Sequence, residues 1–196
     1  MRLFVALDID DNIRSRIIQF ITGVRDLAPN IRWVRPESLH VTLKFIGEQS
    51  ETQVEEIKRA LHTVASEHFD IRFRAYGFFP ERRTAQVFWI GIEAGPQLQS
   101  LATTVDAKLA AINIPQEDHA FKPHLTLARC KGASGGPWKR NKDGSGGGFE
   151  HLQKELASLP APEFGSTVAR EFFLYQSELS PGGSIYKKVA TFALGQ

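Results

Sequence analysis

Two short segments of this chain repeat each other almost letter for letter. Residues 40–43 read His-Val-Thr-Leu, and residues 124–127 read His-Leu-Thr-Leu. Both lie in apolar runs that are typical of β-strands. Because side chains two residues apart in a strand point the same way, each segment is expected to present an imidazole and a hydroxyl on one face and its apolar residues on the core face.

This pair of motifs suits chemistry at a phosphate. Histidine titrates near neutrality, so one imidazole can activate water while a second protonates the departing oxygen. The threonine hydroxyls can donate hydrogen bonds to the non-bridging phosphate oxygens. Neither step needs a metal or a covalent intermediate. The structural alternative is two half-buried histidines bonded to backbone, but two copies with matched apolar neighbours favour a function.

The remainder of the chain predicts an α+β protein with internal pseudo-symmetry. Helical spacing of apolar residues follows the first strand, and Ser50 with Gln53 forms a possible capping box before a second helix. The predicted strands cover about 1–8, 31–34, 39–46, 70–78, 84–93, 121–130, 168–180 and 185–194, and the predicted helices about 13–24, 50–64, 96–112 and 149–159.

The length of 196 residues favours a single domain over 1–196. A glycine-rich, basic segment at about 131–148 interrupts it. This segment is expected to be a mobile loop rather than a domain linker, because strands needed to complete the fold come after it.

Composition excludes several classes of protein. The net charge of +2 gives only weak whole-molecule attraction to nucleic acid, so such binding must come from local patches. A single cysteine, Cys130, excludes an internal disulfide. The sequence has no membrane-length apolar run and no metal-ligand spacing, and its first residues lead us to expect no signal peptide. We therefore expect a cytoplasmic protein without a membrane or metal partner.

The motifs and their surroundings resemble the 2H phosphoesterase superfamily. Within it, the chain is similar to the bacterial and archaeal RNA 2′,3′-cyclic phosphodiesterases, also called 2′-5′ RNA ligases. The similarity covers nearly the whole length and is carried by residues 2–6, 33–34, 39–47, 87–92 and 123–129, with Leu174, Ser177, Leu179 and Tyr186.

The resemblance implies a bilobal fold, in which two antiparallel sheets face each other across a cleft with helices packed outside. It also implies hydrolysis of RNA 2′,3′-cyclic phosphate ends to a 2′-phosphomonoester, without metal or cofactor. His40 would be the proton donor and His124 the proton acceptor, a choice that the residues themselves leave open. Thr42, Thr126 and Arg129 would bind the phosphate.

Strand periodicity bears on two further positions, Arg129 and Lys44, and three other residues need comment. Strict alternation places Arg129 on the face opposite His124, so a contact with phosphate requires a bulge or a strand end. It places Lys44 on the same face as His40. Phe45 and Tyr186 are further candidates for binding a substrate base. Gln86 stands where the family often has an arginine.

Two other functions remain open at this point. The same residues would serve a 2′-5′ RNA ligase or a phosphodiesterase for another small cyclic or 2′-5′ phosphoester, because joining is attack by a 5′ hydroxyl on the cyclic phosphate. A module that binds RNA ends without catalysis is the non-enzymatic alternative. No obligate protein partner is indicated, and a monomer is expected.

Overall fold

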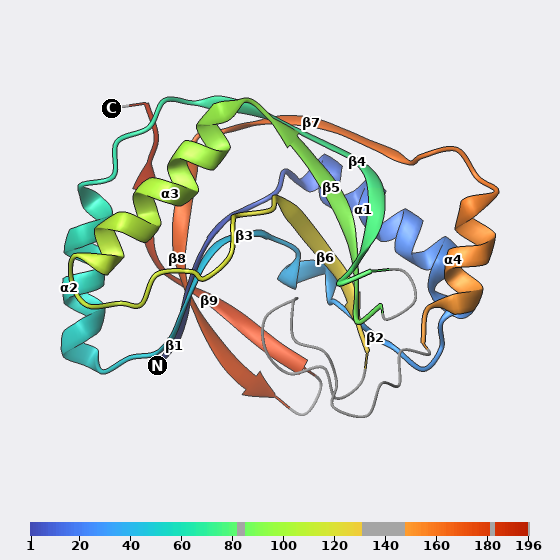
Figure 1. Cartoon of the computed structure of the whole chain (residues 1–196), viewed down its shortest axis with the longest axis horizontal. Coiled ribbons are helices and arrows are strands. Elements are labelled where there is room, and N and C mark those ends of the chain that lie inside the picture. Colours follow the sequence, from blue (N-terminus) through green and yellow to red (C-terminus); the bar gives the residue numbers. More distant parts are fainter. Residues whose placement is uncertain (82–84, 131–147, 181–182, 196) are drawn as a thin grey trace.

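The α+β fold class is confirmed by the computed structural model, which describes residues 1–81, 85–130, 148–180 and 183–195 (Figure 1). The helices are α1 (Asp11–Val24), α2 (Glu51–His62), α3 (Pro96–Ala110) and α4 (Glu150–Ala157). The strands are β1 (Arg2–Leu7), β2 (Arg32–Trp33), β3 (Val41–Glu48), β4 (Phe69–Phe79), β5 (Val87–Ala94), β6 (His124–Arg129), β7 (Glu163–Ala169), β8 (Glu171–Ser180) and β9 (Gly183–Ala193).

The strands form two antiparallel halves that are joined at one place. Their order is β7-β4-β5-β6-β3-β1-β8-β9, and β2 adds to β6. The halves β7-β4-β5-β6 and β3-β1-β8-β9 meet where β3 and β6 pair through Val41 and Leu125. These residues belong to the two repeated motifs, so the motifs lie side by side at the junction of the halves.

An approximate two-fold relation links β1–α1–β3 to β5–α3–β6. In the first unit Ala6 pairs with Thr42 and Leu7 with Val41. In the second, Trp89 pairs with Thr126 and Ile90 with Leu125. Each helix then packs across the junction, because α1 contacts β7 and α3 contacts β3. The predicted internal pseudo-symmetry is therefore present in the strand registers.

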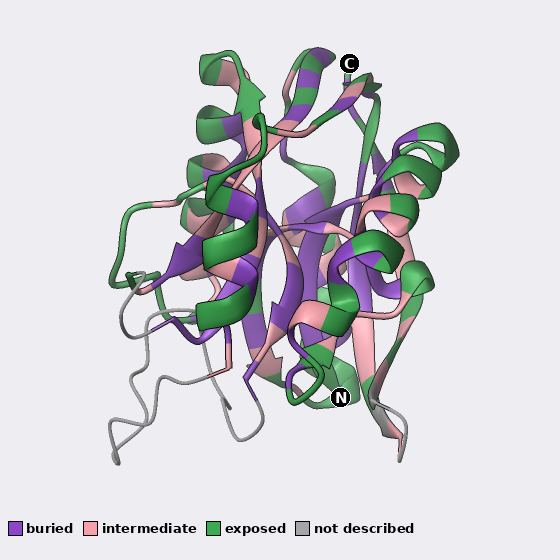
Figure 2. Ribbon diagram, turned by 90° about the vertical axis from the view of Figure 1, so that its right-hand side faces the viewer, coloured by how far each residue is buried: buried purple, intermediate pink, exposed green. Residues whose placement is uncertain are grey.

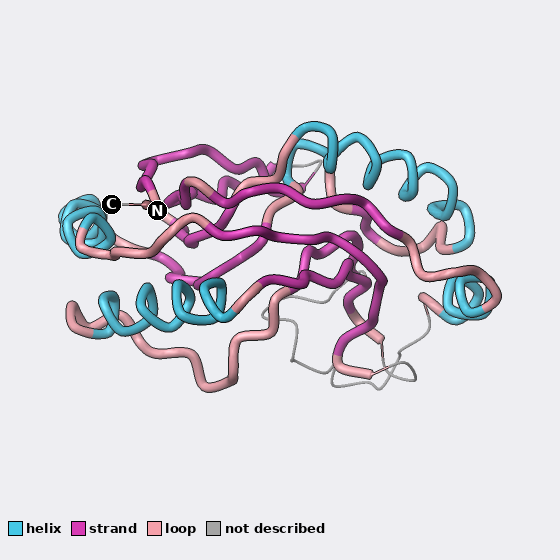
Figure 3. Tube along the Cα trace, turned by 90° about the horizontal axis from the view of Figure 1, so that it is seen from above, coloured by secondary structure: helices cyan, strands magenta, loops and turns pink. Residues whose placement is uncertain are grey.

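The helices are amphipathic and cover the outside of the strands. In α1 the buried side chains are Ile13, Ile17, Ile21 and Val24, and the Asp10 carboxylate accepts a hydrogen bond from the Asn12 amide at the helix start. The predicted capping box of Ser50 and Gln53 opens α2. The strands are largely buried and the outer helix faces exposed (Figure 2), and from above the helices flank the strands (Figure 3).

Some elements differ from their predicted bounds. β7 was not predicted; the residues of this strand alternate only partly in burial, and Gly165 interrupts them at a positive φ of 109°. β2 has only two residues, and β6 begins at His124 rather than at 121. Residues 131–147 of the predicted glycine-rich loop lie outside the described residues. In the described part of the chain, no helix is both long and apolar enough to cross a membrane.

Both motif strands have an extra residue at the same place, and β3 has a second one at Ile46. Between the pairs Val5–Lys44 and Ala6–Thr42 the register skips Leu43, and between Phe88–Ala128 and Trp89–Thr126 it skips Leu127. Such a β-bulge lets two successive residues face the same side and shifts the alternation beyond it. The fourth residue after each histidine, Lys44 or Ala128, thus turns to the core. The fifth, Phe45 or Arg129, returns to the face that carries the motif.

The prediction that Lys44 shares the His40 face is therefore wrong. The bulge at Leu43 turns Lys44 to the other side, where its side chain is 2% exposed. There Nζ lies 2.5 Å from the Asp106 carboxylate on α3 and donates to the Pro115 carbonyl at 2.6 Å, with Glu117 at 3.9 Å. The ammonium thus links β3 to α3 and to the segment that leads to β6.

We predict that Asp106→Asn lowers the free energy of unfolding by about 2–3 kcal/mol, because it leaves a buried ammonium without its main counter-charge. Urea denaturation measures this. Glu55→Gln is the matched control, since it breaks the exposed Lys58–Glu55 pair, which contributes at most about 0.5 kcal/mol. Equal costs for the two variants would contradict the role given to Lys44.

Candidate functional site

The two motifs are arranged crosswise at the junction of the sheet halves. Because β3 and β6 are antiparallel and pair at Val41 and Leu125, the register continues with Thr42 beside His124 and His40 beside Thr126. Each histidine therefore lies next to the threonine of the other motif. All four side chains are partly exposed, whereas Val41 and Leu125 are fully buried.

Both imidazoles are oriented by the same backbone contact. Nδ1 of His40 lies 2.7 Å from the carbonyl oxygen of Ser38, and Nδ1 of His124 lies 2.7 Å from that of Lys122. A carbonyl oxygen can only accept, so each Nδ1 carries the hydrogen. In the neutral ring the lone pair is then on Nε2, which makes Nε2 the atom that takes or gives a proton in both residues.

Aromatic rings hold the two imidazoles in place. The His40 ring centroid lies 4.8 Å from that of Phe4 and 5.1 Å from that of Tyr186. On the other side the His124 ring lies 5.1 Å from Phe79 and 6.4 Å from Trp89. This packing restricts the rings and withdraws them from water.

Burial and charge lower the pKa of both histidines. Burial is the main cause of a fall in the pKa of His40 from 6.5 to about 4, which the charge of Arg129 reinforces and the contact with Ser38 and the charge of Asp8 oppose. Burial and Arg129 also lower the pKa of His124, against the contact with Lys122. Both imidazoles are thus mainly neutral in the free protein near pH 7.

Arg129 is turned to the same face as the histidines by the bulge at Leu127. Its charge acts on both His40 and His124. Its own pKa is lowered by burial and by Arg32 and raised by Tyr186, whose ring also contacts His40. The alternation argument against Arg129 fails because the strand has an extra residue there, and the guanidinium is positioned to meet an anion between the motifs.

Phe45 occupies the position in β3 that Arg129 occupies in β6. It pairs with Phe4 on the motif face, and its ring centroid lies 6.2 Å from that of Phe4. The side chain is 48% exposed, which is high for a large apolar residue. The Phe45 ring is therefore available to stack on a flat group bound beside the motifs.

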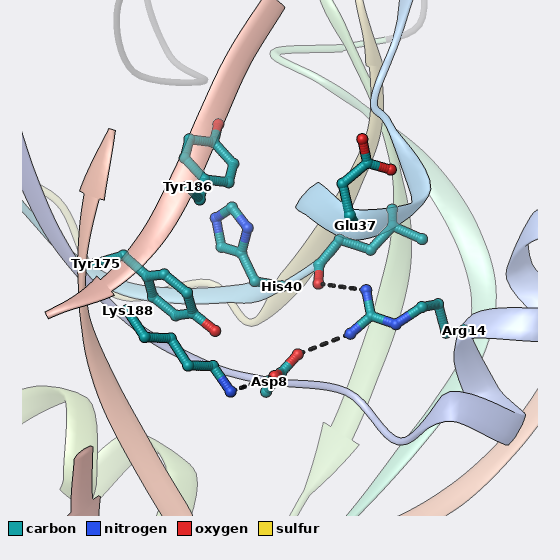
Figure 4. A pocket seen from close by; sticks show the side chains of 8 residues that line it. Asp8, Arg14, Glu37, His40, Tyr175, Tyr186 and Lys188 are labelled. Atoms are coloured by element: carbon teal, nitrogen blue, oxygen red, sulfur yellow. Dashed lines mark hydrogen bonds and ion pairs between the residues drawn. The ribbon is translucent and has the colours of Figure 1, made fainter. Parts of the chain in front are cut away.

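A cavity flanks the motifs on each side. One, of about 280 Å³, is lined by Asp8, Arg14, Glu37, Leu39, His40, Tyr175, Tyr186 and Lys188 (Figure 4). The other, of about 270 Å³, lies between β3, α3 and the segment before β6, and its lining includes Thr42, Phe45, Gln99, Phe121 and His124. The first is mainly polar and the second has more apolar side chains.

The sequence interpretation missed Asp8 and Tyr175 as neighbours of His40. Both line the cavity beside His40. They lie in other segments of the sequence than the two motifs, so the periodicity of the motif strands gave no signal for them. Gln86 is 4% exposed, and its backbone bonds to Phe79 and Cys130. Within the described residues, no three His, Cys, Asp or Glu side chains gather as metal ligands would.

The chain matches a family model and curated proteins over almost its whole length. The model described as LigT like Phosphoesterase matches twice, at residues 7–89 and 90–186, and each match contains one motif. An RNA 2′,3′-cyclic phosphodiesterase of Archaeoglobus fulgidus is 33% identical over 98% of this chain and 99% of that protein. One of Thermus thermophilus is 32% identical over 99% of this chain and 90% of that protein.

Solved structures of similar fold support the same family assignment. TT0787 of Thermus thermophilus superposes with a TM-score of 0.76 at 29% identity, covering 98% of this chain and 97% of that one. E. coli LigT complexed with 3′-AMP superposes with a TM-score of 0.77 at 25% identity, covering 100% and 98%. With two motifs and two matches to one model that together cover most of its length, the chain belongs to the LigT-like phosphoesterase family.

Proposed function

We propose that this phosphoesterase hydrolyses the 2′,3′-cyclic phosphate at RNA ends to a 2′-phosphomonoester by two-histidine acid–base catalysis. The crosswise arrangement of the motifs at the Val41–Leu125 pair carries the proposal, because it supplies two proton-transfer atoms and two hydroxyls at one place. The curated relatives named RNA 2′,3′-cyclic phosphodiesterases support the substrate.

In the proposed reaction, Nε2 of His124 accepts a proton from water as the water oxygen attacks phosphorus. The bond from phosphorus to the 3′ oxygen breaks, and Nε2 of His40 gives its proton to that oxygen. The product has a 2′-phosphate and a free 3′ hydroxyl. His40 ends neutral and His124 protonated, so proton exchange with solvent resets the site.

The other side chains bind the phosphate and the terminal nucleoside. Thr42 and Thr126 donate hydrogen bonds to the non-bridging oxygens, and Arg129 offsets the negative charge that gathers there. Phe45 stacks on the base, and Tyr186 contacts the substrate near His40. In this proposal the enzyme acts in the cytoplasm as a monomer, needs no metal, cofactor or protein partner, and forms one domain that includes the loop at about 131–148.

We predict that His40→Ala and His124→Ala each lower kcat about 10²–10⁴-fold, since each removes one proton transfer. Hydrolysis of a cyclic-phosphate oligonucleotide in EDTA is the assay. His151→Ala is the matched control, because His151 is exposed on α4, and its activity should equal that of the wild type. Full activity of either motif variant, or loss of wild-type activity in EDTA, would refute the mechanism.

Replacing Arg129 should weaken phosphate binding and shift the histidine pKa values. Arg129→Met should lower kcat/KM about 10²-fold and raise the pKa of both histidines, because its charge lowers both. Arg129→Lys keeps the charge but loses the paired donors, so its kcat/KM should lie between those of the wild type and of Arg129→Met. Arg32→Gln, an exposed cation opposite Arg129 on β2, is the control; an equal effect there would count against a direct contact.

The lowered pKa values predict a specific pH dependence. In the free enzyme His124 must be neutral and His40 protonated, and both pKa values lie below 6.5. kcat/KM should therefore be bell-shaped with its maximum below pH 6.5 and should fall towards neutral pH as His40 loses its proton. The bound phosphate anion favours protonation, so the kcat profile should lie at higher pH. A kcat/KM that rises continuously to pH 8 would contradict this account.

A further inference from the structure

The approximate two-fold relation breaks down beside the histidines. Gly91 of β5 pairs with His124. In the other half the β1–β3 register ends at the pair Leu7–Val41, and the next residues along the two segments, Asp8 and His40, line one cavity. The two halves therefore place a carboxylate next to one imidazole and a glycine next to the other.

The Asp8 carboxylate is held in a fixed position. Oδ1 accepts from the Ile9 amide at 2.9 Å and from Arg14 Nη2 at 2.8 Å, and Oδ2 lies 2.8 Å from Lys188 Nζ. The Tyr175 hydroxyl also bonds to it, and Figure 4 shows this hydroxyl directed at Asp8. Burial alone would raise the pKa of Asp8, but the bond and charge of Lys188 with the other contacts lower it, so the group stays ionised.

Arg14 connects this carboxylate to the backbone that orients His40. Its guanidinium also donates to the carbonyls of Pro36, at 2.7 Å, and Leu39, at 3.4 Å. These residues flank Ser38, whose carbonyl accepts the Nδ1 hydrogen of His40. The Asp8–Arg14 pair thus fixes both a negative charge near His40 and the turn that sets its ring orientation.

The second half has no equivalent arrangement in the part of the chain that the structure describes. A Cβ at Gly91 would lie 2.7 Å from the Arg74 carbonyl oxygen, so a side chain there does not fit without a backbone shift. Where Tyr175 packs near His40, the corresponding strand position holds Phe79, which has no hydroxyl. The carboxylates of Asp106 and Glu117 line the cavity beside His124 but pair with Lys44.

Charged and titratable groups face His40 from every element around it. They are Asp8 after β1, Arg14 on α1, Glu37 in the turn before β3, His124 and Arg129 on β6, Tyr175 on β8, and Tyr186 and Lys188 on β9. Of these, Asp8 favours the protonated form of His40, whereas Arg129 and His124 oppose it.

We propose that Asp8 is a positioning residue that stabilises the protonated imidazole of His40 against the effect of burial and thereby helps His40 to act as the proton donor. The inference rests on the proposed function. A phosphate anion bound between the motifs offsets the charge of Arg129, which acts on both histidines. Burial still lowers the pKa of His40, and the charge of Asp8 opposes that effect on His40.

The direct test is an NMR titration of the His40 and His124 rings, with inorganic phosphate as the anionic probe. Asp8→Asn should lower the pKa of His40 by roughly one unit and leave that of His124 in place. Glu37→Gln, an exposed carboxylate in the same cavity, is the matched control and should leave the pKa of His40 unchanged. An unchanged pKa of His40 in Asp8→Asn, or an equal shift in the pKa of both rings, would overturn the inference.

A second variant, which is expected to shift the pKa of His40 in the opposite direction, covers the case in which Asp8→Asn fails to fold. Lys188→Met keeps a long apolar side chain beside Phe173, whose ring centroid lies 3.8 Å from Nζ, but removes a cation that neutralises Asp8. It should raise the pKa of His40, and a fall or no change would refute the role of Asp8. Because titration needs no turnover, a wild type inactive on cyclic phosphate would refute the proposed function without altering this result.

Discussion

The site depends on the backbone pairing of two motif strands at Val41 and Leu125. This contact joins the two halves of the sheet, and it fixes which groups lie opposite each other. Because side chains alternate in antiparallel strands, burying this pair in the core forces the flanking histidines and threonines onto the other face. A slip of one residue would bury the imidazoles, so the hydrophobic core and the site are specified by the same register.

The duplicated motif, the fold class and the helix starts were predictable, because each follows from local periodicity or capping chemistry. The bulges at Leu43 and Leu127 were not, since nothing in either strand distinguishes an extra residue from a regular one. They decide the placement of Lys44, Phe45 and Arg129. β7 was missed because its partner β4 lies far away in sequence and supplies the pairing that its own residues do not indicate.

The two halves are alike in backbone and different in charge. Duplicated strands place two equivalent imidazoles side by side, but the proposed acid and base must differ for one proton to be given and another taken. Beside His40 stands the fixed carboxylate of Asp8, and beside His124 stands Gly91, where the Arg74 carbonyl leaves no room for a side chain. A difference that the motifs do not contain is thus supplied by the strands that pair with them.

Product analysis in ¹⁸O-labelled water tests the central claim most directly. An RNA oligonucleotide ending in a 2′,3′-cyclic phosphate is incubated with the enzyme in EDTA, and the product is examined by mass spectrometry and by its sensitivity to 3′-specific phosphatase. Water attack with departure of the 3′ oxygen predicts a 2′-phosphate that contains one ¹⁸O atom. A 3′-phosphate, a joined strand without label, or unchanged substrate would contradict the account.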